Sequence, residues 1–327
     1  MTLRRNDYDV TNSVNTTIPV DVCDEVTRLY GDLYQRDVPG SLTQAFHDLA
    51  RLYRGEYPGF RECDTHYHNI QHVLDVTLAM TRLMNGCVRS ATARALSERL
   101  FCFGVIIALF HDCGYIRNRR DSRHQNGAEY TLTHVSRGAR FLEGYLPKLG
   151  LADLAGAATR VIHFTGYEIA VDRIVLPDPE LRLVGNLLGS ADILAQMADR
   201  CYLEKCYDRL YPEFVRGGIA RHRNRDGSEE VLFASAADLI FKTPRFYQGA
   251  TRRLNQDLGG CHKLIEKHFG GQNVYFDELE KNINYARAIA MEGDISLLRR
   301  RPPGTSEKPE ESRTTSARLP ALMMKEA

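Results

Sequence analysis

Apolar residues recur at helical spacing in several stretches of the chain. The clearest repeats are Val73, Val76, Met80 and Leu83; Leu181, Val184, Leu188, Ala191 and Ala195; and Phe276, Leu279, Ile283 and Ala286. Such spacing places the apolar side chains on one face of a helix. Alternating apolar and polar positions, typical of strands, are nearly absent, and glycines and prolines divide the chain into about ten segments. The pattern predicts an all-α fold.

The longest apolar run extends from Leu100 to Phe110 and is interrupted only by Gly104. A membrane-spanning helix needs about 20 apolar residues, so this run is too short to cross a bilayer. It leads directly into His111 and Asp112. We therefore expect a buried element that ends in an imidazole and a carboxylate, and no association with a membrane.

Charge and cysteine content exclude several classes of protein. The 327 residues include 43 basic and 42 acidic side chains, a net charge of +1, so no overall field favours a nucleic-acid partner. The eight cysteines include no Cys-x-x-Cys pair, which argues against a zinc ribbon or a disulfide framework. Reduced thiols in the cytoplasm fit this pattern best.

Composition also suggests the domain boundaries. Residues 1–20 lack the apolar segment of a secretory signal, and we expect them to be flexible. Residues 21–295 carry the helical repeats and are predicted to form one domain. Residues 296–327 are rich in Arg, Pro, Glu, Ser and Thr, and we expect this tail to be disordered.

Histidines are concentrated in less than a third of the chain. Seven of the eleven belong to this cluster: His66, His68, His72, His111, His124, His134 and His163. If one helix carries His68, His72 and Asp75, all three side chains share one face. A lone histidine is usually an ordinary polar residue, but histidines grouped with carboxylates predict metal ligation.

Asp192 is the clearest carboxylate candidate. It lies in Ser190-Ala191-Asp192-Ile193-Leu194, beside the apolar face of a predicted helix. An unpaired carboxylate in such a place costs several kcal/mol, whereas a divalent cation would make the position favourable. The alternative is a surface residue, or one paired with Arg182 or Arg200.

Residues 67–76 carry the most specific motif. They read Tyr-His-Asn-Ile-Gln-His-Val-Leu-Asp-Val. This segment resembles the HD superfamily of metal-dependent phosphohydrolases, and within it the cyclic-nucleotide phosphodiesterases, whose hallmark is Tyr-His-Asn-x-x-His-x-x-Asp-Val. The likeness runs from about Asp64 to Asp192 and includes His111-Asp112. It implies that residues 21–295 form an HD-domain, phosphodiesterase-like helical bundle with a dinuclear metal site and a C-terminal helical extension.

The resemblance also implies a role for each candidate residue. Four side chains would hold the first cation: His72, His111, Asp112 and Asp192. Asp112 would bridge to a second cation, and His68 would be the general acid. His134 and His163 look like the additional histidines of the second site, although either could instead orient a ligand or a water. The cations could be Mn, Fe, Mg, Zn or Ni, because residue type does not choose among them.

The expected activity is hydrolysis of a phosphoester, foremost a 3′,5′-cyclic nucleotide, by metal-activated hydroxide, with His68 protonating the departing sugar oxygen. The expected partner is therefore a small nucleotide or phosphoester. Two alternatives stay open: a 5′-nucleotidase or other phosphomonoesterase, and a non-catalytic metal-binding domain that senses a ligand. Neither Gln196 nor Gln248 has the surroundings of the glutamine that grips the purine in the animal enzymes, so the substrate base is unassigned.

Several neighbouring residues have two possible roles. Asp75 could fix the tautomer of an imidazole or form a surface salt bridge, and Asn69 is expected to hold the backbone near the site. Glu129 could bind water at the metal or stabilise a helix N-terminus. The basic loop at residues 117–123 could contact a phosphate or simply face solvent.

Overall fold

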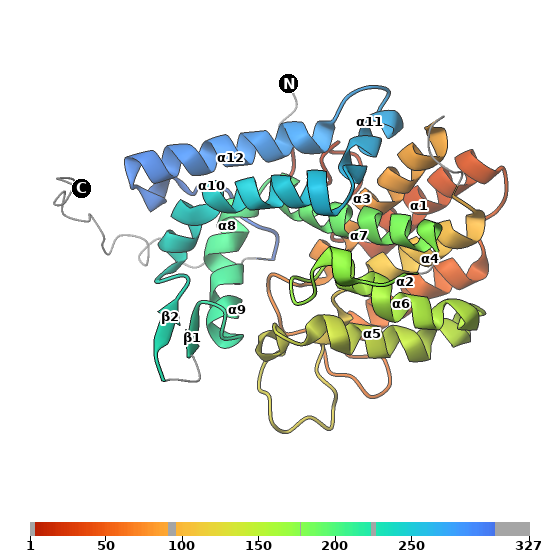
Figure 1. Ribbon diagram of the computed structural model, residues 1–327, viewed down its shortest axis with the longest axis horizontal. Coiled ribbons are helices and arrows are strands. Elements are labelled where there is room, and N and C mark those ends of the chain that lie inside the picture. Colours follow the sequence, from red (N-terminus) through yellow and green to blue (C-terminus); the bar gives the residue numbers. More distant parts are fainter. Residues whose placement is uncertain (1–3, 91–95, 177, 224–226, 305–327) are drawn as a thin grey trace.

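Helices account for most of the chain, which confirms the all-α prediction (Figure 1). The computed structural model describes residues 4–90, 96–176, 178–223 and 227–304. Its α-helices are α1 (Pro19–Tyr34), α2 (Gly40–Tyr53), α3 (Ile70–Arg89), α4 (Glu98–Phe110), α5 (His134–Tyr145), α6 (Ala155–Val161), α7 (Pro179–Ala198), α8 (Tyr202–Lys205), α9 (Tyr211–Arg216), α10 (Ala236–Arg252), α11 (Ile265–His268) and α12 (Val274–Glu292).

Helix α3 is at the centre of the bundle. It packs against α1, α4, α7 and α11, and the four apolar residues of its predicted repeat are all fully buried. The apolar run at residues 100–110 forms α4, whose N-terminus is capped by the Ser97 hydroxyl, which accepts a hydrogen bond from the Leu100 amide. Every residue of that run is buried, so α4 delivers His111 and Asp112 to the interior.

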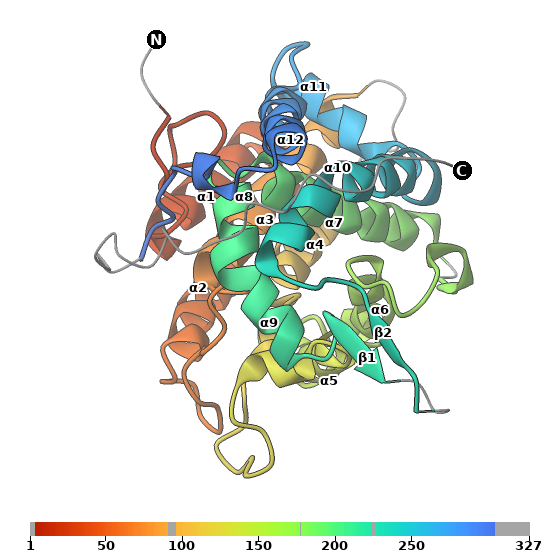
Figure 2. The same cartoon turned by 90° about the vertical axis from the view of Figure 1, so that its left-hand side faces the viewer.

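Helices that come later in the chain pack around α3 and α4. α12 packs against α7 and α10, and α5 packs against α6 and the short helix η1 (Cys113–Tyr115) (Figures 1 and 2). A single hydrophobic core contains residues from Val14 to Leu298. The candidate site therefore lies in a scaffold whose parts share one core.

A small β-hairpin is a departure from helix that the apolar pattern did not predict. Strands β1 (Arg221–Arg223) and β2 (Glu229–Val231) pair antiparallel, with Arg221 opposite Val231 and Arg223 opposite Glu229. The strands are short and mostly charged, so they lack the apolar alternation by which strands are recognised.

The N-terminal segment differs from the expectation of flexibility over residues 1–20. Residues 4–18 fold against the bundle, and α1 begins at Pro19. Asp9 is 3% exposed, accepts hydrogen bonds from the Val14 and Ser13 amides, and pairs with the buried Arg82 of α3 at 2.7 Å. This anchor joins residues 73 positions apart, so local composition does not show it.

The start of the C-terminal tail is also packed, unlike the disorder expected from residue 296 onward. Leu298 is buried. Arg300 donates to the Asn282 side chain at 2.8 Å, and its amide donates to Glu204 at 3.1 Å. Residues 305–327, which make up the rest of the tail, lie outside the described residues.

Replacing Asp9 with Asn is expected to lower the free energy of unfolding by about 3–5 kcal/mol, because it leaves the charge of Arg82 buried without its partner. Burial alone would raise the pKa of Asp9, but Arg82 and local hydrogen bonds outweigh it and lower that pKa to about 2. The wild-type contribution is thus complete above the unfolded-state pKa of 3.8 and is lost as the pH falls toward 2.

Urea unfolding at several pH values measures both effects. Asp9→Asn should be less stable at neutral pH and should lose less stability than wild type between about pH 4 and pH 2. Asp24→Asn, on the exposed face of α1, is the matched control. Equal stability of Asp9→Asn and wild type would contradict an anchoring role.

Candidate metal centre

Asn69 sets the start of α3 and thereby the position of His72. Its side-chain oxygen caps the helix by accepting from the His72 amide at 3.2 Å, and its amide group donates to the His66 carbonyl at 2.9 Å. The expectation that Asn69 holds the backbone is confirmed. However, α3 begins at Ile70, so His68 precedes the helix rather than sharing a helical face with His72.

His111 and Asp112 follow the last residue of α4. The Nδ1–H of His111 donates to the Ala108 carbonyl at 2.8 Å, because a carbonyl can only accept. This contact leaves Nε2 of His111 facing Asp112, at 3.3 Å from Oδ2. The backbone at the end of α4 therefore orients the imidazole toward the carboxylate.

Four of the predicted ligands converge from three helices. His72 Nε2 lies 3.2 Å from Asp112 Oδ2 and 3.4 Å from Asp192 Oδ1, and His111 Nε2 lies 4.0 Å from Asp192 Oδ1. Ligand atoms of His72, His111 and Asp112 all lie within 4.8 Å of one another. We call His72, His111, Asp112 and Asp192 the four-residue group. Asp192 thus faces the histidines rather than Arg182 or Arg200.

The four-residue group has the chemistry of a cation site. His111 Nε2 and Asp112 Oδ2 are buried and have no hydrogen-bond partner within the described part of the chain. Buried polar atoms are normally satisfied, so this pair requires an explanation. Two imidazole nitrogens and two carboxylates are donors that suit Mn, Fe, Zn, Ni or Mg, so the residues fit a divalent cation.

Electrostatics favour positive charge at the same place. Burial would lower the pKa of His72, but the carboxylates of Asp112 and Asp192, which lie 3.2 and 3.4 Å from its Nε2, outweigh burial and raise that pKa to about 10. The pKa of His111 is also raised, because Asp112 outweighs burial. Although burial opposes it, His111 and His72 hold the pKa of Asp112 well below its usual value. The carboxylates therefore stabilise cationic partners here.

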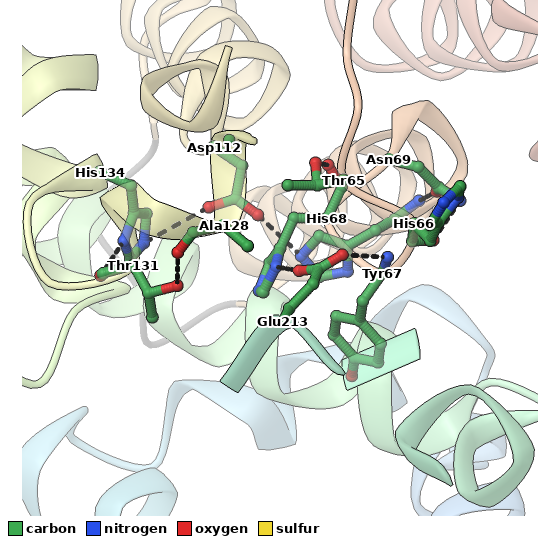
Figure 3. Close-up of polar contacts among 12 residues, drawn as sticks. Thr65, His66, Tyr67, His68, Asn69, Asp112, Ala128, Thr131, His134 and Glu213 are labelled. Atoms are coloured by element: carbon green, nitrogen blue, oxygen red, sulfur yellow. Dashed lines mark hydrogen bonds and ion pairs between the residues drawn. The ribbon is translucent and has the colours of Figure 1, made fainter. Parts of the chain in front are cut away.

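His134 approaches Asp112 from the other side (Figure 3). Its Nε2 lies 3.7 Å from Asp112 Oδ1, and its Nδ1–H donates to the Thr131 carbonyl at 2.7 Å. A side chain at Gly114 would lie 1.8 Å from the His134 carbonyl, so glycine is required for this approach of α5. Asp112 thus presents one oxygen to His72 and His111 and the other to His134.

His163 forms a separate pair. Its Nδ1 lies 2.5 Å from Glu168 Oε1. Within the described ranges, no hydrogen bond or ion pair links His163 to the four-residue group. Glu168 opposes the effect of burial on the pKa of His134, so the two lie within electrostatic range of each other. The structure therefore gives His163 a carboxylate partner that the sequence did not suggest.

His68 is held by two residues that sequence reasoning missed. Its Nδ1 lies 2.6 Å from Oε2 of Glu213, whose other oxygen accepts from the Tyr67 amide at 2.6 Å (Figure 3). Its ring stacks on Tyr115 with centroids 4.2 Å apart and planes at 16°, and Tyr115 stacks on His134 at 4.3 Å and 18°. These contacts fix the plane of the His68 imidazole and leave its Nε2 edge for other partners.

Asp75 lies behind His72 and not on a solvated face. Burial and the nearby Asp199 raise its pKa to about 7, although Lys205 opposes them. Asp75 and His72 line a cavity of about 10 Å³, roughly the room that one water molecule needs. The salt-bridge alternative for Asp75 on an exposed face is therefore wrong.

The basic loop and Glu129 have structural roles. Arg117 pairs with Asp64 at 2.6 Å, and Arg119 donates to the Gly55 carbonyl at 2.6 Å. Glu129 accepts from the Asn126 amide at 3.0 Å in a capping box at η2 (Gly127–Tyr130), so its helix N-terminal role is confirmed. These contacts hold the loop that precedes α5.

Comparisons with known proteins do not identify a family for this chain. Among the described helices, none has the length and apolar character to cross a membrane. A scan of family models gave no match to the chain, and searches of curated proteins and of solved structures also found none.

Proposed function

We propose that this chain is a metal-dependent phosphohydrolase of the HD type, and that its substrate is a phosphoester, foremost a 3′,5′-cyclic nucleotide. The observation that carries the proposal is the buried pair of His111 Nε2 and Asp112 Oδ2, which lie 3.3 Å apart and are faced by His72 and Asp192. The phosphodiesterase motif at residues 67–76 supplies the substrate class.

The four-residue group would hold the first cation. Asp112 Oδ1 and His134 would contribute to a second, because the two oxygens of Asp112 face different imidazoles. When bound, divalent cations supply Lewis acidity toward the phosphate and favour a water-derived nucleophile at neutral pH. His163 supports this arrangement less directly, since its Nδ1 pairs with Glu168.

His68 would supply the proton that the departing sugar oxygen needs. Its ring lies next to His72, with centroids 5.8 Å apart, so the proton donor is beside the four-residue group. Glu213 occupies the Nδ1 side, which leaves Nε2 to donate. Tyr115 prevents the ring from turning out of this plane. A well-placed general acid contributes about 10² to 10⁴ in rate.

The test is hydrolysis by metal-depleted protein reloaded in turn with Mn²⁺, Fe²⁺, Zn²⁺, Ni²⁺ or Mg²⁺, with metal content measured by mass spectrometry. Cyclic AMP and cyclic GMP, 5′-AMP and 5′-GMP, and bis(p-nitrophenyl) phosphate form the substrate panel. We expect metal-dependent turnover of the cyclic nucleotides.

Other results would redirect the proposal. Turnover of the 5′-nucleotides alone would identify a nucleotidase. Metal bound in stoichiometric amount with no turnover of any substrate would favour the non-catalytic ligand-sensing domain.

A further inference from the structure

An exposed tyrosine lies four residues after His163 and has no role in the candidate metal centre. Tyr167 follows η5 (Ile162–Phe164) and is 65% exposed. Single exposed apolar residues are common, so exposure alone implies nothing. What sets Tyr167 apart from a singly exposed apolar residue is the buried Arg253 packed against its ring.

Arg253 backs the Tyr167 ring from inside the protein. Its guanidinium carbon lies 4.1 Å from the ring centroid, although Arg253 itself is only 8% exposed. One of its nitrogens donates to the Phe164 carbonyl at 2.8 Å and to the Gly166 carbonyl at 2.6 Å. Within the ranges that the structure describes, no carboxylate lies within ion-pair distance of it. The Arg253 guanidinium therefore contacts both the Tyr167 ring and the loop that carries this ring.

The same loop is fixed to the helix that carries Asp192. A side chain at Gly189 would lie 2.5 Å from the Phe164 carbonyl, so glycine lets the loop lie directly on α7. Gly189 is three residues before Asp192, less than one helical turn away.

We propose that Tyr167, backed by Arg253, is the platform on which the base of a nucleotide substrate stacks while its phosphate lies at the four-residue group. This inference rests on the proposed function and deepens it by assigning the part of the substrate that the sequence left unassigned. Nucleobases stack on aromatic side chains and on arginine planes, and the interaction tolerates different bases. The platform therefore selects nucleotides over phosphoesters without a base, and it does not separate adenine from guanine.

The experiment compares Mn²⁺-loaded wild type, Tyr167→Ala and Tyr167→Phe on cyclic AMP and on its baseless analogue, methyl ribofuranoside 3′,5′-cyclic phosphate. Loss of one base–aromatic stack should raise the KM of Tyr167→Ala for cyclic AMP about tenfold. Tyr167→Phe keeps the ring and should stay close to wild type. Tyr247→Ala removes a tyrosine that lies 6.0 Å from Arg287 between α10 and α12, and it is the matched control.

The baseless substrate separates the two proposals. Its KM should be the same in all four proteins if the ring contacts only the base. A wild type that hydrolyses cyclic AMP with an unchanged KM in Tyr167→Ala would overturn the platform and leave the phosphohydrolase intact. Equal increases in KM for both substrates would also overturn it, because the ring would then act through the loop.

A binding measurement covers the case in which no substrate is hydrolysed. Calorimetric titration of the Mn²⁺-loaded protein with cyclic AMP should then show about tenfold weaker binding by Tyr167→Ala than by Tyr167→Phe. Equal affinity of the two variants, or no binding by wild type, would overturn the platform. The absence of turnover tests the phosphohydrolase proposal, and the titration tests the platform, so the two failures are distinguishable.

Discussion

Asp112→Ala is expected to abolish metal binding at the candidate centre and to reduce phosphoester hydrolysis by about a thousandfold or more. The physical reason is that its two oxygens face three imidazoles, those of His72, His111 and His134. Loss of a single hydrogen-bond donor from an active site already costs about 10²–10³ in kcat. Loss of a carboxylate shared by two cation positions should lower kcat by at least the upper end of that range.

Metal content and turnover are measured on the same preparations of wild type and variant. Asp172→Ala, at an exposed position of η6 (Val171–Arg173), is the matched control and should keep both properties. Circular dichroism checks that Asp112→Ala is folded. A folded variant with wild-type metal content and turnover would refute the assignment of this centre.

Sequence reasoning worked best where the chemistry follows a long buried element. The run at residues 100–110 is apolar on all sides, so it had to be internal, and the residues directly after it had to be internal too. His72 and Asp192 lie on helices whose apolar repeats fix which face is buried. The apolar pattern predicted buried surroundings for these residues, and the family resemblance implied that the four belong to one site.

His68 shows where spacing alone fails. A spacing of four positions between His68 and His72 suggested a shared helical face, but α3 begins at Ile70. The signal that could have corrected this is Asn69, since asparagine favours the N-cap position and so marks the residue after it as the first of the helix. The structure still brings the two rings together, with their centroids 5.8 Å apart.

Glu213 could not be found from the sequence. It lies 145 residues after His68, in a short helix without a motif, and only tertiary packing brings the two together. A π-helical turn at residues 206–210 separates α8 from α9. Such turns change the direction of the following side chains and are frequent at functional sites. Nothing in local propensity predicts this turn.

His68→Ala is expected to lower kcat for cyclic nucleotides by about 10² to 10⁴ while the protein keeps its metal. Its Nδ1 contacts Glu213 rather than the carboxylates of the four-residue group, so its removal should leave the cation ligands in place. Steady-state kinetics and metal analysis on the same samples measure both effects. His66→Ala is the matched control, because His66 is exposed and accepts the Asn69 hydrogen bond with its backbone carbonyl, which the substitution keeps.

Glu213→Gln distinguishes a positioned proton donor from a ring that merely fills space. The Glu213 carboxylate accepts from both His68 and the Tyr67 amide, and a glutamine has one acceptor oxygen for these two donors. We expect kcat to fall about 10- to 100-fold, the usual cost of losing a residue that orients an active-site group. KM and metal content should change little.

If His68→Ala retains wild-type kcat, or if it loses metal together with activity, His68 is not the general acid. Glu213 then serves only to close the loop before α3.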